Sequence, residues 1–115
     1  MDLKEIKTKK IFIESAVSPQ FIADSIAKHS TKTSIGAHQI FLGQIRSDEM
    51  GGKKVQAIEF SAYKEMAEVE YYNIRELIFA KYDLTCMHVY HSLGRINAGE
   101  INLFVFVSSV HRKDC

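Results

Sequence analysis

The segment I-N-L-F-V-F-V-S-S-V, residues 101–110, says most about the fold of this chain. Its apolar side chains occupy successive positions instead of alternating with polar ones, which is typical of a strand covered on both faces. Such a strand lies in the middle of a sheet. We therefore expect residues 101–110 to form a central strand, and the pair His111 and Arg112 follows directly where this strand ends.

Local signals on either side of this segment predict the other elements. Ser18 followed by Pro19 indicates a helix start, since serine caps a helix and proline fits its first turn. Runs rich in β-branched and aromatic residues indicate strands, and apolar residues at helical spacing indicate helices. The expected elements are strands at residues 9–15, 35–45, 55–63, 84–91 and 101–110, and helices at 18–29 and 64–82.

This order, β-α-β-β-α-β-β, predicts an α+β fold in which two helices pack on a mainly antiparallel sheet, as one domain over residues 1–115. The polar residues 46–54, with Gly51 and Gly52, are expected to form a mobile loop joining two strands of an open-ended hairpin. Gly43 indicates a bulge or a close approach by another backbone. Residues 92–100 are expected to turn the chain.

The expected helix at residues 64–82 contains no glycine or proline and has an amphipathic pattern. Its glutamates gather in the N-terminal half, where the helix dipole favours negative charge. The apolar residues that we place on its packing face are Met66, Val69, Ile74, Leu77 and Ile78.

Composition limits the classes of protein to which the chain can belong. With 115 residues, 46% apolar and 25% charged, it has the make-up of one globular domain. The formal net charge of +1, from 15 basic and 14 acidic residues, gives no field that would attract nucleic acid or an anionic membrane. The apolar runs are shorter than the ~20 residues that cross a bilayer, and residues 1–10 lack the core of a secretory signal. We expect a cytoplasmic protein in which Cys86 and Cys115 are unpaired thiols.

The sequence contains no recognisable motif for a metal or a nucleotide. His88 and His91 are three residues apart on an expected strand, so their side chains point to opposite faces and cannot readily share one ion. The glycines do not extend to a phosphate-binding loop or a dinucleotide fingerprint. We therefore expect no metal and no cofactor.

Two arginines stand just where strands end. Arg46 follows the strand at 35–45, and Arg112 follows His111 after the last strand. If these strand ends are adjacent in the sheet, the two arginines and the histidine form a cationic pocket that suits a small anionic substrate. His111 and Arg112 can serve one site only if the regular strand ends near Val110, so we expect an irregular segment there, such as a helix start.

Several separated segments resemble the large, catalytic subunit of molybdopterin synthase, and they occur in the same order as in that family. The segments are G-A-H-Q-I-F-L-G-Q-I-R (36–46), E-F-S-A-Y-K-E-M-A (59–67), H-S-L-G-R-I-N-A-G-E (91–100) and V-S-S-V-H-R (107–112). The corresponding family patterns are G-A-x-x-x-F-x-G-x-V-R, E-x-Y-x-x-M-A, H-R-x-G-x-L-x-x-G-E and V-x-S-x-H-R. Several motifs in the right order are much more specific than any one of them.

The resemblance implies an α/β-hammerhead fold and an enzyme of molybdenum cofactor biosynthesis. The family's reaction converts cyclic pyranopterin monophosphate (precursor Z) into molybdopterin by installing two dithiolene sulfurs. The sulfur arrives as a thiocarboxylate on the Gly-Gly C-terminus of a small ubiquitin-like subunit, whose tail inserts into the pocket of the large subunit. Two large subunits form a central homodimer, with a small subunit at each end of a heterotetramer.

By position, the resemblance carries over two groups of site residues. The arginines would hold the substrate phosphate and offset charge as the cyclic phosphate opens, and the histidine would orient substrate or move a proton. The residues assigned to substrate binding are Phe41, Gln44, Ile45, Arg46, His111 and Arg112, of which Arg46, His111 and Arg112 are the expected catalytic ones.

The chain departs from the family pattern at two places. Ser92 stands where the family often has arginine. The family also continues beyond the His-Arg pair through a segment with lysines held to be catalytic, to which Lys113 is not a positional match. The resemblance therefore implies a shortened form with impaired catalysis, and normal dithiolene formation by a chain that ends at Cys115 would refute this.

A different class of protein stays open on the residues alone. The order β-α-β-β-α-β is also that of ferredoxin-like sandwiches, so the alternative is a non-enzymatic module that binds a small ligand or regulates. Failure to bind both a thiocarboxylated partner and the pterin precursor would favour this module. The chain is not expected to be the sulfur carrier itself, because it ends in Lys-Asp-Cys rather than Gly-Gly.

Overall fold

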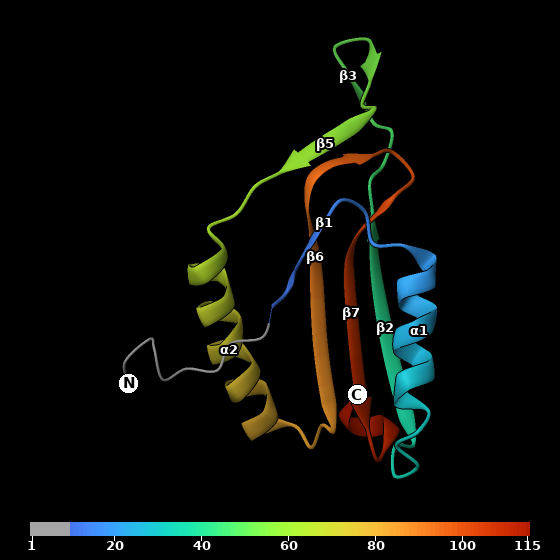
Figure 1. The fold of residues 1–115 in the computed structure, drawn as a ribbon, viewed down its shortest axis with the longest axis vertical. Helices are drawn as coiled ribbons and strands as arrows, with labels where there is room; N and C mark the ends of the chain where they lie inside the picture. Colours follow the sequence, from blue (N-terminus) through green and yellow to red (C-terminus); the bar gives the residue numbers. More distant parts are fainter. Residues whose placement is uncertain (1–9) are drawn as a thin grey trace.

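The computed structural model describes residues 10–115, which form two α-helices and a main sheet (Figure 1). Residue 9, where we expected the first strand to begin, lies outside the described residues, as does most of the segment considered for a secretory signal. The elements are β1 (Phe12–Glu14), α1 (Pro19–His29), β2 (Ala37–Gln44), β3 (Glu49–Met50), β4 (Lys53–Lys54), β5 (Ala57–Phe60), α2 (Lys64–Lys81), β6 (Cys86–Asn97), β7 (Ile101–Ser109) and a final 3₁₀ turn, η2 (Arg112–Asp114).

β7 lies inside the sheet, with β6 on one side and β2 on the other, and both neighbours run antiparallel to it (Figure 1). β1 pairs in parallel with β6 on the side away from β7, and β5 pairs with the far end of β6 in the antiparallel direction. The predicted α+β fold with a mainly antiparallel sheet is therefore confirmed, and so is the central position of the last strand.

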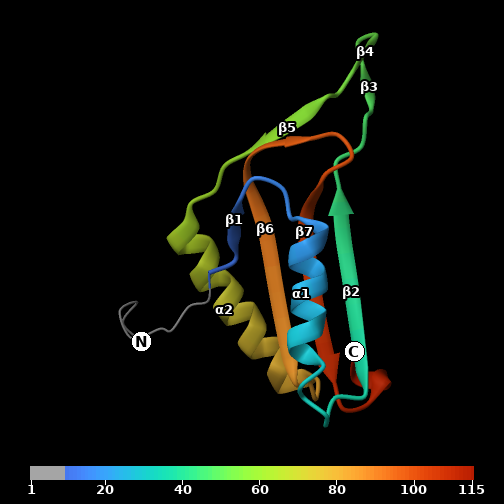
Figure 2. The same ribbon diagram turned by 45° about the vertical axis from the view of Figure 1, so that its right-hand side comes forward.

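The two helices cover opposite faces of the sheet. Side chains alternate along β7, so Phe104 and Phe106 point to one face and Val107 points to the other. Phe104 and Phe106 pack against a group that includes Phe21 of α1, whereas Val107 packs against a second group that includes Tyr71 of α2. Figure 2 shows α1 lying along the first face, in front of β7. The continuous apolar pattern of β7 reflects this double cover.

Helix α1 begins and ends where local signals predict. Ser18 Oγ accepts a hydrogen bond of 3.1 Å from the backbone N–H of Phe21, and Pro19 occupies the first turn. The last residue is His29, whose ring Nδ1 lies 2.7 Å from the carbonyl oxygen of Ser25. The Ser18 cap fixes the start of the helix. The hydrogen bond to Ser25 in the last turn holds the buried His29 over the sheet.

The expected hairpin between the strands at 35–45 and 55–63 is wrong. β2 pairs with β7 and β5 pairs with β6, so these two strands have different partners. The polar segment between them contains the small hairpin β3–β4, whose turn holds Gly51 and Gly52 at φ of 60° and 80°. The mobility of this segment stays a prediction. β2 pairs along the whole of β7, from Ala37 opposite Ser109 to Gln44 opposite Ile101, so β5 is left to pair with β6.

The expected turn at residues 92–100 is only partly right. β6 continues to Asn97 and pairs with β5 from Gly94 onward, and the chain turns at Gly99, where φ is 89°. Gly94 has a φ of 88° inside the strand, at the place where pairing passes from β7 and β1 to β5. The expected irregularity at Gly43 is confirmed, since the register against β7 shifts between Gly43 and Gln44.

The expected packing face of the second helix is partly wrong. Met66, Ile74 and Leu77 are exposed, whereas Ile78 packs against the buried group that contains Tyr71. Helical spacing identifies apolar stripes but not the stripe that meets the sheet. α2 carries two such stripes, and the sheet covers the one that holds Tyr71. Neither helix of residues 10–115 has the length and apolar content that crossing a lipid bilayer requires.

Burial of Tyr71 predicts a loss of stability at alkaline pH. Desolvation raises the pKa of the Tyr71 phenol above 10.0, although the nearby Arg75 acts in the lowering direction. The hydroxyl donates a hydrogen bond of 3.2 Å to the carbonyl oxygen of Met87. The folded state therefore keeps this proton to higher pH than the unfolded state. Its stability contribution is complete below pH 10 and is lost as the pH rises through the folded-state pKa.

Urea unfolding between about pH 8 and about pH 11 measures this loss. Tyr71→Phe should cost about 1 kcal/mol at the lower pH, because one buried hydrogen bond is removed. It should also show a shallower decline in unfolding free energy above pH 10. Tyr90 is a half-buried phenol whose pKa is also raised by desolvation, so the decline should flatten further in the double Phe variant. A decline in Tyr71→Phe as steep as in the wild-type chain would contradict this account.

Candidate functional site

The chain leaves the regular strand geometry directly before the His-Arg pair. β7 ends at Ser109, His111 keeps an extended backbone, and η2 begins at Arg112. The Ser109 hydroxyl donates a hydrogen bond to the carbonyl oxygen of His111. The predicted irregular segment after Val110 is therefore confirmed, and the alternation that would have placed His111 and Arg112 on opposite faces no longer applies.

Gly36 fixes the position of the segment that leads into this pair. Its backbone N–H donates to the carbonyl oxygen of Ser109 at 2.9 Å. A Cβ at Gly36 would lie 2.3 Å from the carbonyl oxygen of Val110, which is far inside contact distance. Only glycine allows the two backbones to approach so closely. The start of β2 therefore holds the end of β7 in place.

The end of the chain presents exposed cations around an open hollow. His111, Arg112 and Lys113 line a space of about 380 Å³ at this end of the sheet. The Cys115 sulfur packs beneath it, 3.6 Å from the carbonyl oxygen of Ala37. Arginine and lysine beside a histidine can bind an anion and exchange a proton with it. Cys86 and Cys115 are both free thiols, as the sequence predicts.

The second group of expected site residues lies at the other end of β2. Arg46 is exposed and forms an ion pair of 3.2 Å with Asp48. Gln44 is exposed as well. Ile45, in contrast, is only 4% exposed, and its backbone N–H donates to the carbonyl oxygen of Glu100 at 3.0 Å. Its side chain belongs to the packed interior, so any role at a site falls to its neighbours.

The structure does not bring the two groups together within one chain. The antiparallel register pairs Ala37 with Ser109 and Gln44 with Ile101. Arg46 therefore lies beyond one end of the sheet, whereas His111 and Arg112 lie beyond the other. The eight residues of β2 alone span about 25 Å. The expected pocket formed by two adjacent strand ends is thus absent from the described residues of a single chain.

Phe41 lies midway between the two groups, on a strand with one open edge. β2 is at the end of the sheet order, and residues 10–115 supply no strand beyond it. Phe41 is 61% exposed, and its neighbours Ile40 and Leu42 are exposed too. An edge strand with three successive exposed apolar residues is a surface that favours pairing with another chain.

The matches to known proteins cover nearly the whole of this architecture. The sequence model described as MoaE protein matches residues 16–115. This chain belongs to the MoaE protein family. The resemblance inferred from the separated motifs is therefore confirmed, and the matched range includes β2, the loop after it and the His-Arg pair.

Curated relatives of this MoaE-family chain include molybdopterin synthase catalytic subunits. The one from Pyrococcus abyssi is 36% identical over 93 residues, which cover 81% of this chain and 62% of the relative. The one from Homo sapiens is 30% identical over 111 residues, which cover 96% of this chain and 58% of the relative. The chain thus spans less than two thirds of the length of either relative.

Solved structures confirm the family fold. Molybdopterin synthase from Staphylococcus aureus superimposes with a TM-score of 0.73 at 27% identity, covering 94% of this chain and 76% of that one. A complex of subunits 1 and 2 of molybdopterin-converting factor from Helicobacter pylori gives a TM-score of 0.76 at 16% identity, covering 90% of this chain and 66% of that one. The second likeness concerns the fold alone.

One group of chemically capable side chains was missed by the sequence reasoning. His29, Cys86 and His88 place their ligand atoms within 4.8 Å of one another. His88 and His91 lie on opposite faces of β6, as expected, and the residues beside His88 are His29 and Cys86. Cys86 and His88 are two residues apart on a strand and therefore share a face, which was a usable signal. Nothing local indicated that His29 would join them.

Proposed function

We propose that this MoaE-family chain acts as the catalytic subunit of a molybdopterin synthase. It transfers sulfur from the thiocarboxylated C-terminus of a small ubiquitin-like subunit to cyclic pyranopterin monophosphate, forming the dithiolene of molybdopterin. The observation that supports this most strongly is the family match over residues 16–115, together with the exposed His111 and Arg112 within it. Free thiols in the chain suit the reducing cytoplasm, where we place the reaction.

The chemistry of the chain end suits a pterin phosphate. A guanidinium group donates to two phosphate oxygens at once, and it suits this task better than an ammonium. Arg112 therefore binds the cyclic phosphate, and His111 orients the substrate or moves a proton. Lys113 adds positive charge to the same hollow. Arg46 and Gln44 complete the site from another direction, and Phe41 lines the approach.

Completion of this site requires a second copy of the chain, because Arg46 and Arg112 lie beyond opposite ends of one sheet. Two β2 strands that pair antiparallel about a two-fold axis run in opposite directions. If the axis passes near Phe41, Arg46 of one copy lies opposite Gly36 of the other. Gly36 is bonded to Ser109, so the His-Arg pair of that copy lies close by. The open apolar edge of β2 supports this pairing.

The small subunit is the second partner in this proposal. The Helicobacter pylori structure is a complex of subunits 1 and 2 of molybdopterin-converting factor, and this chain shares the fold found there. The tail of the small subunit would reach the hollow beside Arg112, since its thiocarboxylate must meet the bound pterin. One small subunit on each of two copies gives a heterotetramer with two sites.

A binding experiment tests this function without depending on turnover. The chain is mixed with the thiocarboxylated small subunit, and the mass of the complex is measured by light scattering. Binding of cyclic pyranopterin monophosphate is measured by calorimetry, and molybdopterin is measured by mass spectrometry. We expect both partners to bind. Binding of neither would contradict the proposal and favour the non-enzymatic ferredoxin-like module.

Substitution at the chain end sharpens the test. Arg112→Ala should weaken binding of the pterin roughly 10- to 100-fold, because a charge-assisted hydrogen bond to phosphate is lost. The same variant should still bind the small subunit. Lys64→Ala is the matched control, since Lys64 is an exposed cation on α2 that pairs with Glu14 at 3.5 Å. Equal weakening by both variants would show that only general charge is involved.

A further inference from the structure

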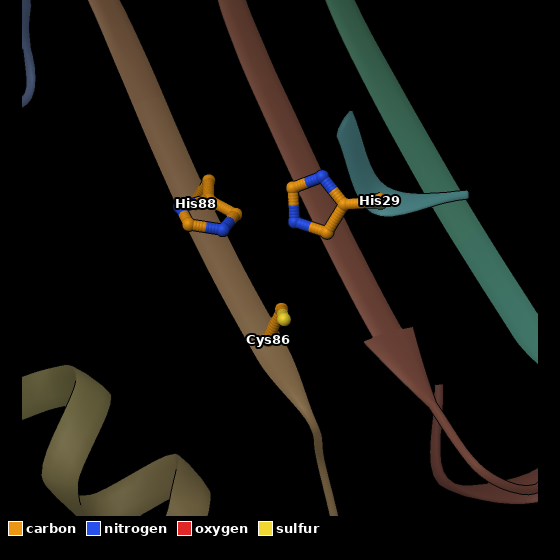
Figure 3. A group of neighbouring side chains, drawn as sticks. All are labelled: His29, Cys86 and His88. Carbon is orange, nitrogen blue, oxygen red and sulfur yellow. The ribbon is translucent and has the colours of Figure 1, made fainter. Parts of the chain in front are cut away.

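A largely buried cluster of side chains that can bind a metal lies beneath the last turn of α1. His29 extends from the helix toward β6, and Cys86 and His88 rise from that strand to meet it (Figure 3). One potential ligand atom from each residue lies within 4.8 Å of the others. None of these residues belongs to the proposed pterin site.

The fold itself assembles this group. Cys86 and His88 share one face of β6 because they are two residues apart, and it is the face that α1 covers. In the register of the sheet, His88 lies beside Phe106 of β7. The His29 ring meets the Phe106 ring at 4.6 Å and the His88 ring at 4.9 Å, edge to face in both cases. Ring packing thus holds the two histidines beside each other.

The orientation of His29 points to a missing ligand. Its Nδ1 lies 2.7 Å from the carbonyl oxygen of Ser25, and a carbonyl can only accept, so Nδ1 carries the proton. The lone pair is then on Nε2. His29 is only 9% exposed, and its Nε2 is buried without a hydrogen-bond partner. A buried acceptor left unpaired is costly, and a backbone carbonyl on the other ring nitrogen is the usual arrangement of a metal-bound histidine.

We propose that His29, Cys86 and His88 bind a transition-metal ion of the zinc class. Two imidazole nitrogens and one thiolate form a donor set that suits Zn²⁺ and excludes Mg²⁺ and Ca²⁺, which prefer oxygen. Zinc–ligand bonds of about 2.0–2.3 Å require ligand atoms roughly 3.3–3.8 Å apart. The ligand atoms lie within 4.8 Å of one another, so the side chains have to move closer together by up to about 1 Å when the ion binds. Three protein ligands leave one position for water or another small ligand.

Lys32 lies beside the sulfur of this cluster. Its ammonium donates a hydrogen bond of 3.1 Å to Cys86 Sγ. A bound cation and this ammonium compete for the same sulfur and repel each other. The ammonium has to leave when the ion enters. Removal of this charge in Lys32→Met should therefore tighten metal binding, although Lys32 is not a ligand.

The test uses the full chain, kept reduced and titrated with Zn²⁺ against a chromophoric chelator. We expect one ion per chain, weakened on the order of 100-fold or more in Cys86→Ser or His29→Gln. Lys32→Met should tighten binding several-fold. His91→Ala is the matched control, because His91 lies on the same strand with its side chain on the opposite face, and it should bind as the wild-type chain does.

Two further measurements keep the test decisive if a variant is destabilised. Co²⁺ bound to the wild-type chain should show a sulfur-to-metal charge-transfer band that is absent in Cys86→Ser. Zn²⁺ should raise the melting temperature of the wild-type chain but not that of Cys86→Ser. Absence of binding by the wild-type chain overturns the proposal. Equal affinity in the wild-type chain and the ligand variants overturns it as well.

Discussion

An equimolar mixture of Arg46→Ala and Arg112→Ala chains is expected to bind cyclic pyranopterin monophosphate at about a quarter of the wild-type number of sites, although each variant alone binds it poorly. Each site in the proposed dimer takes Arg46 from one copy and the His-Arg pair from the other. A mixed dimer then has one site in which both arginines are replaced and one in which both are intact. About half of randomly formed dimers are mixed, and one of the two sites in each is intact, so about a quarter of all sites can bind.

Calorimetric stoichiometry after co-expression or subunit exchange measures this recovery. The matched control mixes wild-type chains with the Arg46→Ala/Arg112→Ala double variant. If each site is shared between two copies, that mixture keeps about a quarter of the wild-type number of binding sites. If each site lies within one chain, it keeps about half. Absence of recovery in the first mixture, with half of the sites left in the second, would show that one chain holds both arginines.

Phe104→Ala should destabilise the fold by about 3–5 kcal/mol, the range found when a buried phenylalanine is truncated. Phe104 is 0% exposed in the central strand. Its ring contacts the rings of Phe21, Tyr90 and Phe106, with centroids 6.2, 5.8 and 5.9 Å away. Truncation leaves a cavity beneath α1 that these rings can fill only in part.

Urea unfolding at a fixed protein concentration measures the change, because the proposed dimerisation would make stability depend on concentration. Leu77→Ala is the control for loss of an apolar side chain, since Leu77 is 72% exposed on α2. It should change the unfolding free energy by no more than about 0.5 kcal/mol. A loss below about 1 kcal/mol in Phe104→Ala would contradict the central position of this ring.

Features that depend on neighbouring residues could be predicted from the sequence. The start of α1 follows from Ser18 and Pro19, because a cap acts within one turn. The central position of β7 follows from its unbroken apolar pattern. The end of the strand near Val110 was expected only on the assumption that His111 and Arg112 serve one site, and the structure places it at Ser109. The irregularity at Gly43 belongs to the same class, since a glycine in a strand marks it locally.

Features that depend on strand pairing could not be predicted. The sequence pattern does not say that β2 pairs with β7 rather than with β5, and this choice separates Arg46 from Arg112. Likewise, the pattern of α2 did not reveal that Tyr71 rather than Leu77 meets the sheet. These outcomes depend on competition among apolar surfaces from distant parts of the chain.

By itself, the sequence determined the class of fold, the ends of the main helices and the family, and it supplied the residues that we propose for the site. Only the tertiary structure decided which of these residues meet. The antiparallel register sends Arg46 and Arg112 to opposite ends of the sheet, and the packing of α1 brings His29 to Cys86. The physical reason is that caps and strand patterns act over a few residues, whereas register and face depend on the burial of side chains far apart in sequence.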